Sequence, residues 1–339
     1  MKHFFKGIRH IFEYLFVLFF YLILRILPRA GVGVAARLCG RAMRLIPGAL
    51  RICEANIRIA FPDWTPAQVR AAARRSLHHV ALNFLEFAWM SGNRRRIERI
   101  CDPDPAIVAH LREYAARGVR IIFVTPHLGS WEACGMMVPY YTGIPMVAIA
   151  KPVKNPYLNR LLNRHGREKA EGLRIIFARG AMRAAVRALR DGVSLGTLID
   201  QNTRVRDGGE FVDFFGLPAP SSMAPAVLMR HCRANNIPAV LVYGASVREN
   251  GRIIPYIEEL PKPFEEYGSD REVIGEIMRM TEKFIRRFPD QYVWYYKRFN
   301  YIPREADDSL RKRYPWYSIP ASPHFYRKVR GTPPSAAGR

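Results

Sequence analysis

The chain has 339 residues, which is enough to bury a sizeable hydrophobic core in one large or two ordinary domains. Its 53 Lys and Arg residues outnumber its 29 Asp and Glu residues, and the formal net charge of +24 predicts an anionic partner such as nucleic acid, a phospholipid surface or an acidic carrier. The sequence lacks zinc-finger spacing, RNP-like aromatic motifs and basic-zipper heptads, and its five scattered cysteines imply neither a disulfide framework nor a metal site.

An apolar segment near the N-terminus distinguishes between these partners. Residues 11–27 are interrupted only by Glu13 and Arg25. The uncharged part, residues 14–24, is short for a membrane span, which needs about 20 residues, but Arg25 at its end can extend its charge to the interface. The pattern predicts a marginal transmembrane helix or a deep interfacial anchor within residues 1–30, against the alternative of a buried core helix. Because more Lys and Arg follow the segment than precede it, a spanning segment would place the large domain in the cytoplasm.

The sequence GVGVAA at residues 31–36 has glycine spacing like that of a dinucleotide-binding loop. Such a loop follows a core strand, and here Pro28 and the apolar segment come first, so we reject that interpretation. We expect these glycines to allow close helix packing. Residues 37–90 have helical patterns, with Thr65 as an N-cap and Pro66 at the first helical position.

Residues 118–135, GVRIIFVTPHLGSWEACG, contain the pattern most typical of a catalytic site. The apolar run at residues 121–124 predicts a buried strand, and Ser130 is a candidate N-cap for the helix that follows. If His127 stays in the loop and Glu132 lies in the first helical turn, both side chains can face one site. The carboxylate would then accept one imidazole N–H while the other ring nitrogen takes a proton from a hydroxyl. The alternative is a helix-capping loop with a satisfied His and a surface Glu.

Beyond residue 118, short apolar runs alternate with helical patterns, which predicts an α/β fold with a mixed, mostly parallel sheet flanked by helices. Asp200 and Gln201 end one predicted strand, where a carboxylate is also a common turn-former. The tail beyond Pro303 is rich in Pro, Ser and Arg, and we expect it to have no fixed role in the core. The predicted strands are 120–124, 145–150, 174–177, 193–199 and 238–243, and the predicted helices are 131–140, 154–166, 180–191, 222–234 and 271–288.

Several blocks resemble, in order, the motifs of one enzyme family. PHLGSWE at residues 126–132 resembles the HX4D/E motif of the glycerolipid acyltransferases, and its Trp before the Glu is most similar to the lipid A biosynthesis acyltransferases of the lauroyl and myristoyl type. LIDQ at 198–201, FFG at 214–216 and PDQYVWYYKRF at 289–299 also resemble blocks of this family. The resemblance extends from about residue 10 to residue 300, and several blocks in family order are more specific than any one alone.

This resemblance implies a glycerol-3-phosphate acyltransferase-like fold with an N-terminal membrane helix. It divides the chain into an anchor at residues 1–30, an acyltransferase domain at 31–302 and a basic tail at 303–339. It also implies a location at the cell inner membrane, with the catalytic domain on the cytoplasmic face.

The implied activity is transfer of a fatty acyl chain from an acyl carrier protein thioester to a hydroxyl of a lipid A precursor, without a cofactor or a metal. His127 would act as general base, and Glu132 would orient and support its imidazolium. Backbone N–H groups of residues 129–131 would stabilise the oxyanion, and no Ser or Cys nucleophile is required.

The resemblance further implies a set of substrate-binding residues. The family uses an Arg after the second strand at its substrate site. Arg167 fits this position best, and Arg164 is the alternative. The segment could instead be a basic helix face without a substrate role. Residues 77–90 would line a groove for the acyl chain, and Glu86 beside them either matches a Glu of the family or faces solvent. The remaining candidates are Asp200, Gln201, Ser221 and Ser222.

Two other functions fit part of the pattern. A related enzyme could acylate another membrane glycolipid, such as a phosphatidylinositol mannoside. A non-catalytic basic protein that binds membranes or nucleic acid would explain the charge but not the co-occurrence of the family blocks, so we expect no nucleic-acid partner.

Overall fold

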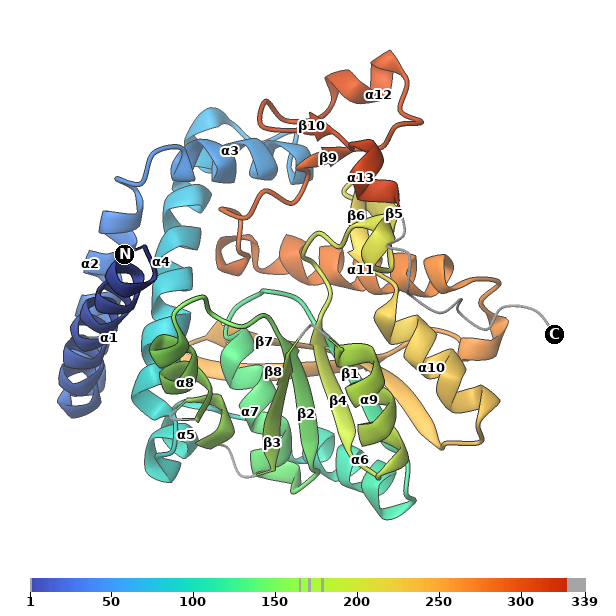
Figure 1. Cartoon of the computed structure of the whole chain (residues 1–339), viewed down its shortest axis with the longest axis horizontal. Coiled ribbons are helices and arrows are strands. Elements are labelled where there is room, and N and C mark those ends of the chain that lie inside the picture. The colour runs from blue at the N-terminus through green and yellow to red at the C-terminus, as the bar shows by residue number, and fades with distance from the viewer. Residues whose placement is uncertain (1, 165, 170–171, 178–179, 328–339) are drawn as a thin grey trace.

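Six strands form the central sheet, in the order β3-β2-β4-β1-β7-β8 (Figure 1). The computed structural model describes residues 2–164, 166–169, 172–177 and 180–327. β1 pairs in parallel with β4 and β7, and β2 in parallel with β3 and β4, whereas β8 runs antiparallel to β7. The predicted mixed, mostly parallel sheet is therefore confirmed. The strands are β1 (Arg120–Thr125), β2 (Met146–Ala150), β3 (Leu173–Phe177), β4 (Ser194–Leu198), β7 (Ala239–Glu249) and β8 (Arg252–Glu259).

The last two strands of the sheet differ most from the prediction. The first four strands lie within one residue of their predicted ends, but β7 continues six residues beyond the predicted end at residue 243. β8 was not predicted, because Pro255 interrupts its pattern. A proline is tolerated in this strand because β8 lies at the edge of the sheet.

The two faces of the sheet pack against different helices. Alternate β1 residues point to opposite faces, so Ile122 and Val124 join one hydrophobic core while Ile121 and Phe123 join the other. The first core includes side chains of α9, α10 and α11, and the second includes side chains of α5, α6 and α7. Two of these helices, α5 (Arg94–Ile100) and α6 (Pro105–Ala116), precede β1 and were not predicted. The helices predicted after β1 agree closely with the structure: α7 (Trp131–Thr142), α8 (Pro156–Arg164), α9 (Ala181–Arg190), α10 (Ala224–Ala234) and α11 (Asp270–Arg287).

The first four helices of the described chain are α1 (Lys2–Ile26), α2 (Arg29–Met43), α3 (Ala49–Ala60) and α4 (Pro66–Met90). The predicted start of α4 is confirmed, because Thr65 and Gln68 form a capping box and Pro66 stands at the first helical position. The prediction that the glycines of 31–36 serve close packing is wrong. The tight contact between α2 and α4 lies at Gly40, where an added Cβ would be 2.7 Å from the Cα of His78.

The C-terminal residues form a folded extension rather than a tail without a core role, so that expectation is wrong for residues 303–327. Tyr314, Tyr317 and Phe325 are buried, and the Tyr314 hydroxyl donates to the carbonyl of Pro218 in the β5–β6 hairpin (2.6 Å). Residues 328–339 lie outside the described part. The elements here are β5 (Gly209–Phe214), β6 (Leu217–Ser222), β9 (Tyr301–Ile302), α12 (Asp308–Lys312), β10 (Ile319–Pro320) and α13 (Pro323–Tyr326).

Candidate active site

The site is built where two adjacent parallel strands end. Thr125 of β1 pairs with Leu198 of β4. Two residues beyond each of them lie His127 and Asp200, so strand register alone brings these two residues together. The Nδ1 of His127 is 2.7 Å from Oδ1 of Asp200, and the backbone N–H of His127 donates to the other carboxylate oxygen (3.0 Å). One carboxylate therefore fixes both the loop and the ring.

The electrostatics of this pair favour an ionised Asp200. Its side chain is fully buried, and burial alone would raise the pKa of the carboxyl. The charge and hydrogen bonds of His127, assisted by the charge of Arg298, outweigh burial and lower the pKa of Asp200 below its ordinary value. An ionised carboxylate accepts the Nδ1 proton of His127, so Nε2 carries the lone pair that can act as a base.

Gln201 contacts the other ring nitrogen of His127. Its Nε2 lies 3.1 Å from the Nε2 of His127. Because Nδ1 faces Asp200 as a donor, the amide of Gln201 donates to the lone pair of Nε2. A substrate hydroxyl that replaced this amide would make the same type of hydrogen bond.

The expected contact between Glu132 and the His127 ring is wrong, because Asp200 and Gln201 occupy the two ring nitrogens. Glu132, in the first turn of α7, instead binds Arg167 through both oxygens, at 2.8 Å to Nε and 2.5 Å to Nη2. The third arm of the guanidinium donates to Asn163 (3.1 Å). Burial by itself would lower the pKa of the Arg167 guanidinium. The charge and hydrogen bonds of Glu132 outweigh this effect and raise that pKa above its ordinary value. This nearly buried pair is one residue from Trp131, whose ring lies 5.4 Å from that of His127.

The other predicted substrate-binding residues lie in different surroundings. Arg164 is exposed, whereas Arg167 is held in the pair just described. Ser221 is buried on β6 and accepts a hydrogen bond from Arg298. Ser222 accepts from the backbone N–H of Ala224 at the start of α10 (3.2 Å). Both hydroxyls thus have partners within the fold.

The loop that carries His127 is held by close backbone contacts. Gly129 has φ +61°, and a Cβ there would lie 2.2 Å from the carbonyl oxygen of Ser246, so this position requires glycine. The backbone N–H groups of Gly129 and Ser130 donate to the carbonyls of Gln291 and Ser246. The expectation that these two N–H groups stabilise an oxyanion is therefore wrong, which leaves Trp131, at the first position of α7, as the candidate of the three.

Ser130 stands at the N-cap position of α7, but its side chain does not cap the helix. Its hydroxyl accepts from Arg248 of β7 (2.9 Å), and Arg248 also forms an ion pair with Glu86 of α4. Glu86 is only 4% exposed, so the solvent-facing alternative is excluded. Burial raises the pKa of the Glu86 carboxyl, with the charge of Arg248 acting in the opposite direction.

Sequence reasoning did not identify two supports of the site. The backbone N–H of Val293 donates to the carbonyl of His127 (3.2 Å), so the aromatic block at 289–299 backs the His loop. Arg298 of the same block is buried and donates to Asn202 (3.0 Å) and to the carbonyl of Pro220 (2.8 Å). The sequence did contain a signal for this role. Arg298 stands among aromatic residues, and a buried Arg needs several hydrogen-bond partners.

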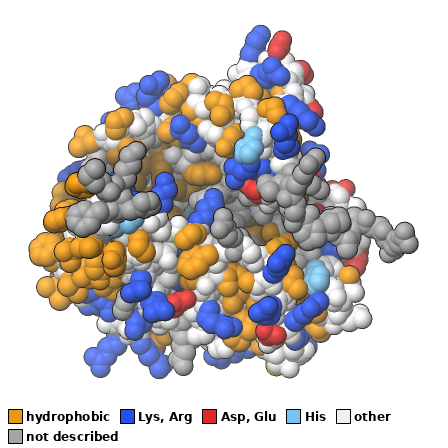
Figure 2. All heavy atoms as spheres, in the orientation of Figure 1, with side chains coloured by type: hydrophobic (Ala, Val, Ile, Leu, Met, Phe, Trp, Pro, Cys, Tyr) orange, Lys and Arg blue, Asp and Glu red, His pale blue; other side chains and the backbone are white. Residues whose placement is uncertain are grey.

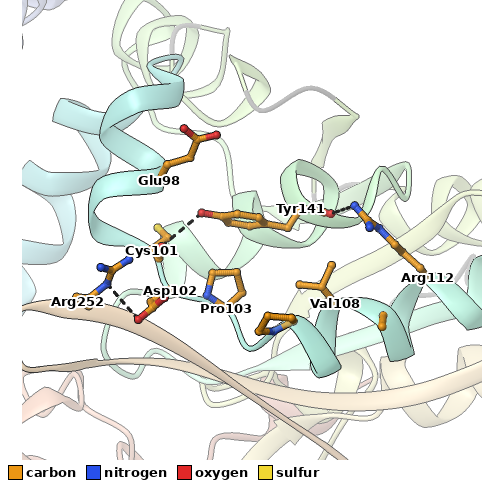
Figure 3. A pocket seen from close by; sticks show the side chains of 10 residues that line it. Glu98, Cys101, Asp102, Pro103, Val108, Arg112, Tyr141 and Arg252 are labelled. Atoms are coloured by element: carbon orange, nitrogen blue, oxygen red, sulfur yellow. Dashed lines mark hydrogen bonds and ion pairs between the residues drawn. The ribbon is translucent and has the colours of Figure 1, made fainter.

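An aromatic path joins the imidazole to the surface of α4. The ring of Trp131 packs edge-on against Phe84, with centroids 5.6 Å apart, and Phe84 is 40% exposed. A cavity of about 440 Å³ lies elsewhere, among α5, α6 and the last turn of α7 (Figure 3). Its charged side chains have protein partners, as in the ion pair between Arg252 and Asp102 (3.1 Å). Within the described residues, no cluster of His, Cys, Asp or Glu is placed to hold a metal ion.

Taken together, the mostly parallel α/β sheet and the imidazole–carboxylate pair at the carboxyl ends of its central strands define a site suited to removing a proton from a hydroxyl. The sequence matches the family model described as bacterial lipid A biosynthesis acyltransferase over residues 1–301. The chain therefore belongs to the bacterial lipid A biosynthesis acyltransferase family, and it is an acyl-transferring enzyme of that biosynthesis. The resemblance stated from the sequence is confirmed. No curated protein matches the chain.

Proposed function

We propose that the enzyme transfers a fatty acyl chain from an acyl carrier protein thioester to a hydroxyl of a lipid A precursor. The acceptor oxygen attacks the thioester carbonyl, its proton passes to Nε2 of His127, and the carbon–sulfur bond breaks. The proton then leaves with the thiolate as a thiol, so the protein forms no covalent intermediate and ends in its starting state. The observation that supports this reaction best is the buried His127–Asp200 pair.

In this mechanism Asp200 holds the ring in the tautomer that exposes the Nε2 lone pair, and its charge stabilises the imidazolium as it forms. The acceptor hydroxyl would take the place of the Gln201 amide, which donates to that lone pair in the structure. The N-terminus of α7, with the N–H of Trp131, is the nearest candidate to meet the developing oxyanion.

We assign Glu132 and Arg167 to the substrate. Both carboxylate oxygens of Glu132 hold the guanidinium in a fixed orientation, and an arginine held in this way suits an acceptor phosphate better than a mobile one. The carboxylate therefore acts through Arg167 rather than through the imidazole. Phe84 and Trp131 would contact the first carbons of the acyl chain on the aromatic path.

The charge of the chain fits both proposed substrates. A net charge of +24 attracts an acidic carrier and an anionic lipid alike. Among the described residues, one helical stretch, Phe5–Ile26, is long and apolar enough to cross a membrane. We propose that it attaches the enzyme to the inner membrane, with the site on the cytoplasmic face.

The test is transfer by purified enzyme from acyl carrier protein thioesters of several chain lengths to a tetra-acylated lipid A precursor. We expect His127→Ala to lower turnover by about 10³-fold or more. His110→Ala is the matched control, because this exposed histidine pairs with Glu259. Near-normal transfer by His127→Ala would refute the mechanism, and transfer only to another glycolipid would refute the acceptor.

A further inference from the structure

Helix α1 is bound to the rest of the protein near its middle and at its C-terminal end. Near the middle, Asn155, just before α8, donates to the carbonyl of His10 (2.8 Å) and to the carboxylate of Glu13 (2.9 Å). At the C-terminal end, the Arg25 guanidinium donates to backbone carbonyls at the end of α4, including that of Ser91 (2.5 Å). The helix therefore lies along the protein and does not project away from it.

One side of α1 faces the protein along most of its length. His10 and Leu24 are buried, and Tyr14 packs against Tyr157 of α8 with ring centroids 5.6 Å apart. These positions recur on one helical face. The opposite face carries large exposed apolar side chains, and Figure 2 shows hydrophobic atoms gathered over this part of the molecule. They include Phe12, Phe16, Phe19, Leu22 and Ile26.

Helix α2 extends this apolar surface. Its buried face consists of Val32, Ala36 and Gly40, which pack against α4. Val34 and Leu38 lie on the opposite face, and the exposed Leu45 and Ile46 follow in the next turn. No residue of α2 is acidic, and Figure 1 shows α1 and α2 on the same side of α4.

Exposed arginines border the α2 part of this surface. Arg37 and Arg41 flank the row of Val34 and Leu38 on one side of the helix. An apolar row beside a basic row on a helix with no acidic residue is the pattern of a helix that lies in the plane of an anionic membrane surface.

We propose that α1 and α2 together form an in-plane membrane-binding surface, and that α1 lies in the cytoplasmic leaflet without crossing the bilayer. This inference rests on the proposed membrane attachment and decides its geometry. The stretch of α1 between the protein-bound residues Glu13 and Arg25 is about 18 Å long. This is shorter than the roughly 30 Å of hydrocarbon that surrounds a spanning helix.

A crossing α1 would carry its protein contacts into that hydrocarbon. The Arg25 end of α4 and the Asn155 end of α8 would both be drawn toward the lipid core. The exposed cations Lys154 and Arg160 of the α8 region would go with them, which the bilayer strongly disfavours. An in-plane α1 keeps every one of these contacts.

Cysteine accessibility in cells tests the topology. The full chain with Cys39→Ser has no exposed cysteine among the described residues, since the other four are buried. Lys6→Cys is added near the start of α1, and Arg271→Cys on α11 is the matched cytoplasmic control. Spheroplasts of a Gram-negative host are treated with a membrane-impermeant maleimide, before and after permeabilisation. A co-expressed inner-membrane protein with one free cysteine in a periplasmic segment reports that labelling works.

We expect Lys6→Cys to be labelled only after permeabilisation, as Arg271→Cys is. Labelling of Lys6→Cys in intact spheroplasts would overturn the inference, while membrane attachment and the proposed reaction would stand. Recovery of the protein in the soluble fraction would contradict the attachment itself, and turnover measured in detergent reports on the reaction separately.

A second measurement tests α2. An environment-sensitive fluorophore is placed at Leu38→Cys in the same Cys39→Ser chain, which is reconstituted with phosphatidylethanolamine and phosphatidylglycerol vesicles. We expect a blue shift, with quenching by lipids that carry a nitroxide near the headgroup, and no change at Arg271→Cys. A label at position 38 that stays in water on membrane-bound protein would overturn the role of α2. A blue shift without vesicles would also overturn it, because it would assign this face to a second copy.

Discussion

At the scale of single residues, the imidazole of His127 is oriented by a carboxylate 73 positions along the chain, not by the nearby Glu132. We predict that Asp200→Asn lowers kcat by about 10³- to 10⁴-fold, because the amide no longer fixes the productive tautomer. Steady-state kinetics with the carrier thioester check this, and circular dichroism checks the fold. A loss below tenfold would mean that Asp200 does not orient the base.

Glu132 and Arg167 are predicted to act as one unit on the acceptor. We expect Glu132→Gln and Arg167→Lys each to raise the acceptor KM strongly, and the double variant to be little worse than either alone, because both remove the same held guanidinium. The measurement is a double-mutant cycle on kcat and KM. If Glu132→Gln lowered kcat alone, Glu132 would act on the chemical step instead.

The lowered pKa of Asp200 predicts how stability depends on pH. A carboxyl with a lower pKa in the folded protein stabilises it fully above the unfolded value, about pH 4, and this contribution is lost as pH falls through the folded value. We expect the difference in unfolding free energy between wild type and Asp200→Asn to be constant above that pH and to shrink below it. Urea titrations across the acid range measure this, and a difference that grew on acidification would contradict it.

At the scale of the elements, the contact of α2 with α4 depends on Gly40. We predict that Gly40→Ala destabilises the protein by about 1 to 3 kcal/mol, because its Cβ would press on the backbone of His78. Gly33→Ala on the same helix is the matched control, since a Cβ there meets only the end of Arg37, at 4.0 Å. That variant should be stabilised slightly by helix propensity. Thermal unfolding compares the two, and equal effects would rule out the packing explanation.

Much of the element pattern follows from the sequence, because apolar runs and caps are local signals. The Thr65–Pro66 start of α4 and strands β1 to β4 are examples. The partner of His127 is not a local signal. It depends on β4 lying beside β1 in the sheet, which strand order decides and residue spacing does not. The sequence indicates that Asp200 follows a strand, but it does not indicate that this strand lies beside β1.

At the scale of the whole molecule, the C-terminal extension links distant parts of the chain. The Tyr317 hydroxyl donates to Asn56 of α3, whose amide donates to the carbonyls of Trp294 (2.7 Å) and Tyr296 (2.8 Å). The sequence could not predict this, because a Pro- and Arg-rich tail is also typical of disorder. Its order comes from three tyrosine and phenylalanine side chains that find buried positions on other elements.

We predict that Tyr317→Phe lowers the unfolding free energy by about 1 to 3 kcal/mol, because it leaves a buried amide oxygen of Asn56 unpaired. Tyr301→Phe is the control, since its hydroxyl has no hydrogen bond within the described part of the chain. Chemical denaturation measures both variants. An unchanged midpoint for Tyr317→Phe would mean that the extension is not coupled to α3 by this bond.

The pairing of Thr125 with Leu198 has a practical consequence for redesign of this enzyme. His127, the proposed base, and Asp200 both follow directly from paired backbone, so their separation is set by the sheet ladder and not by the long connections between strands. We therefore expect that those connections, including the segment with the proposed substrate residue Arg167, can be exchanged to change substrate recognition while His127 and Asp200 stay aligned.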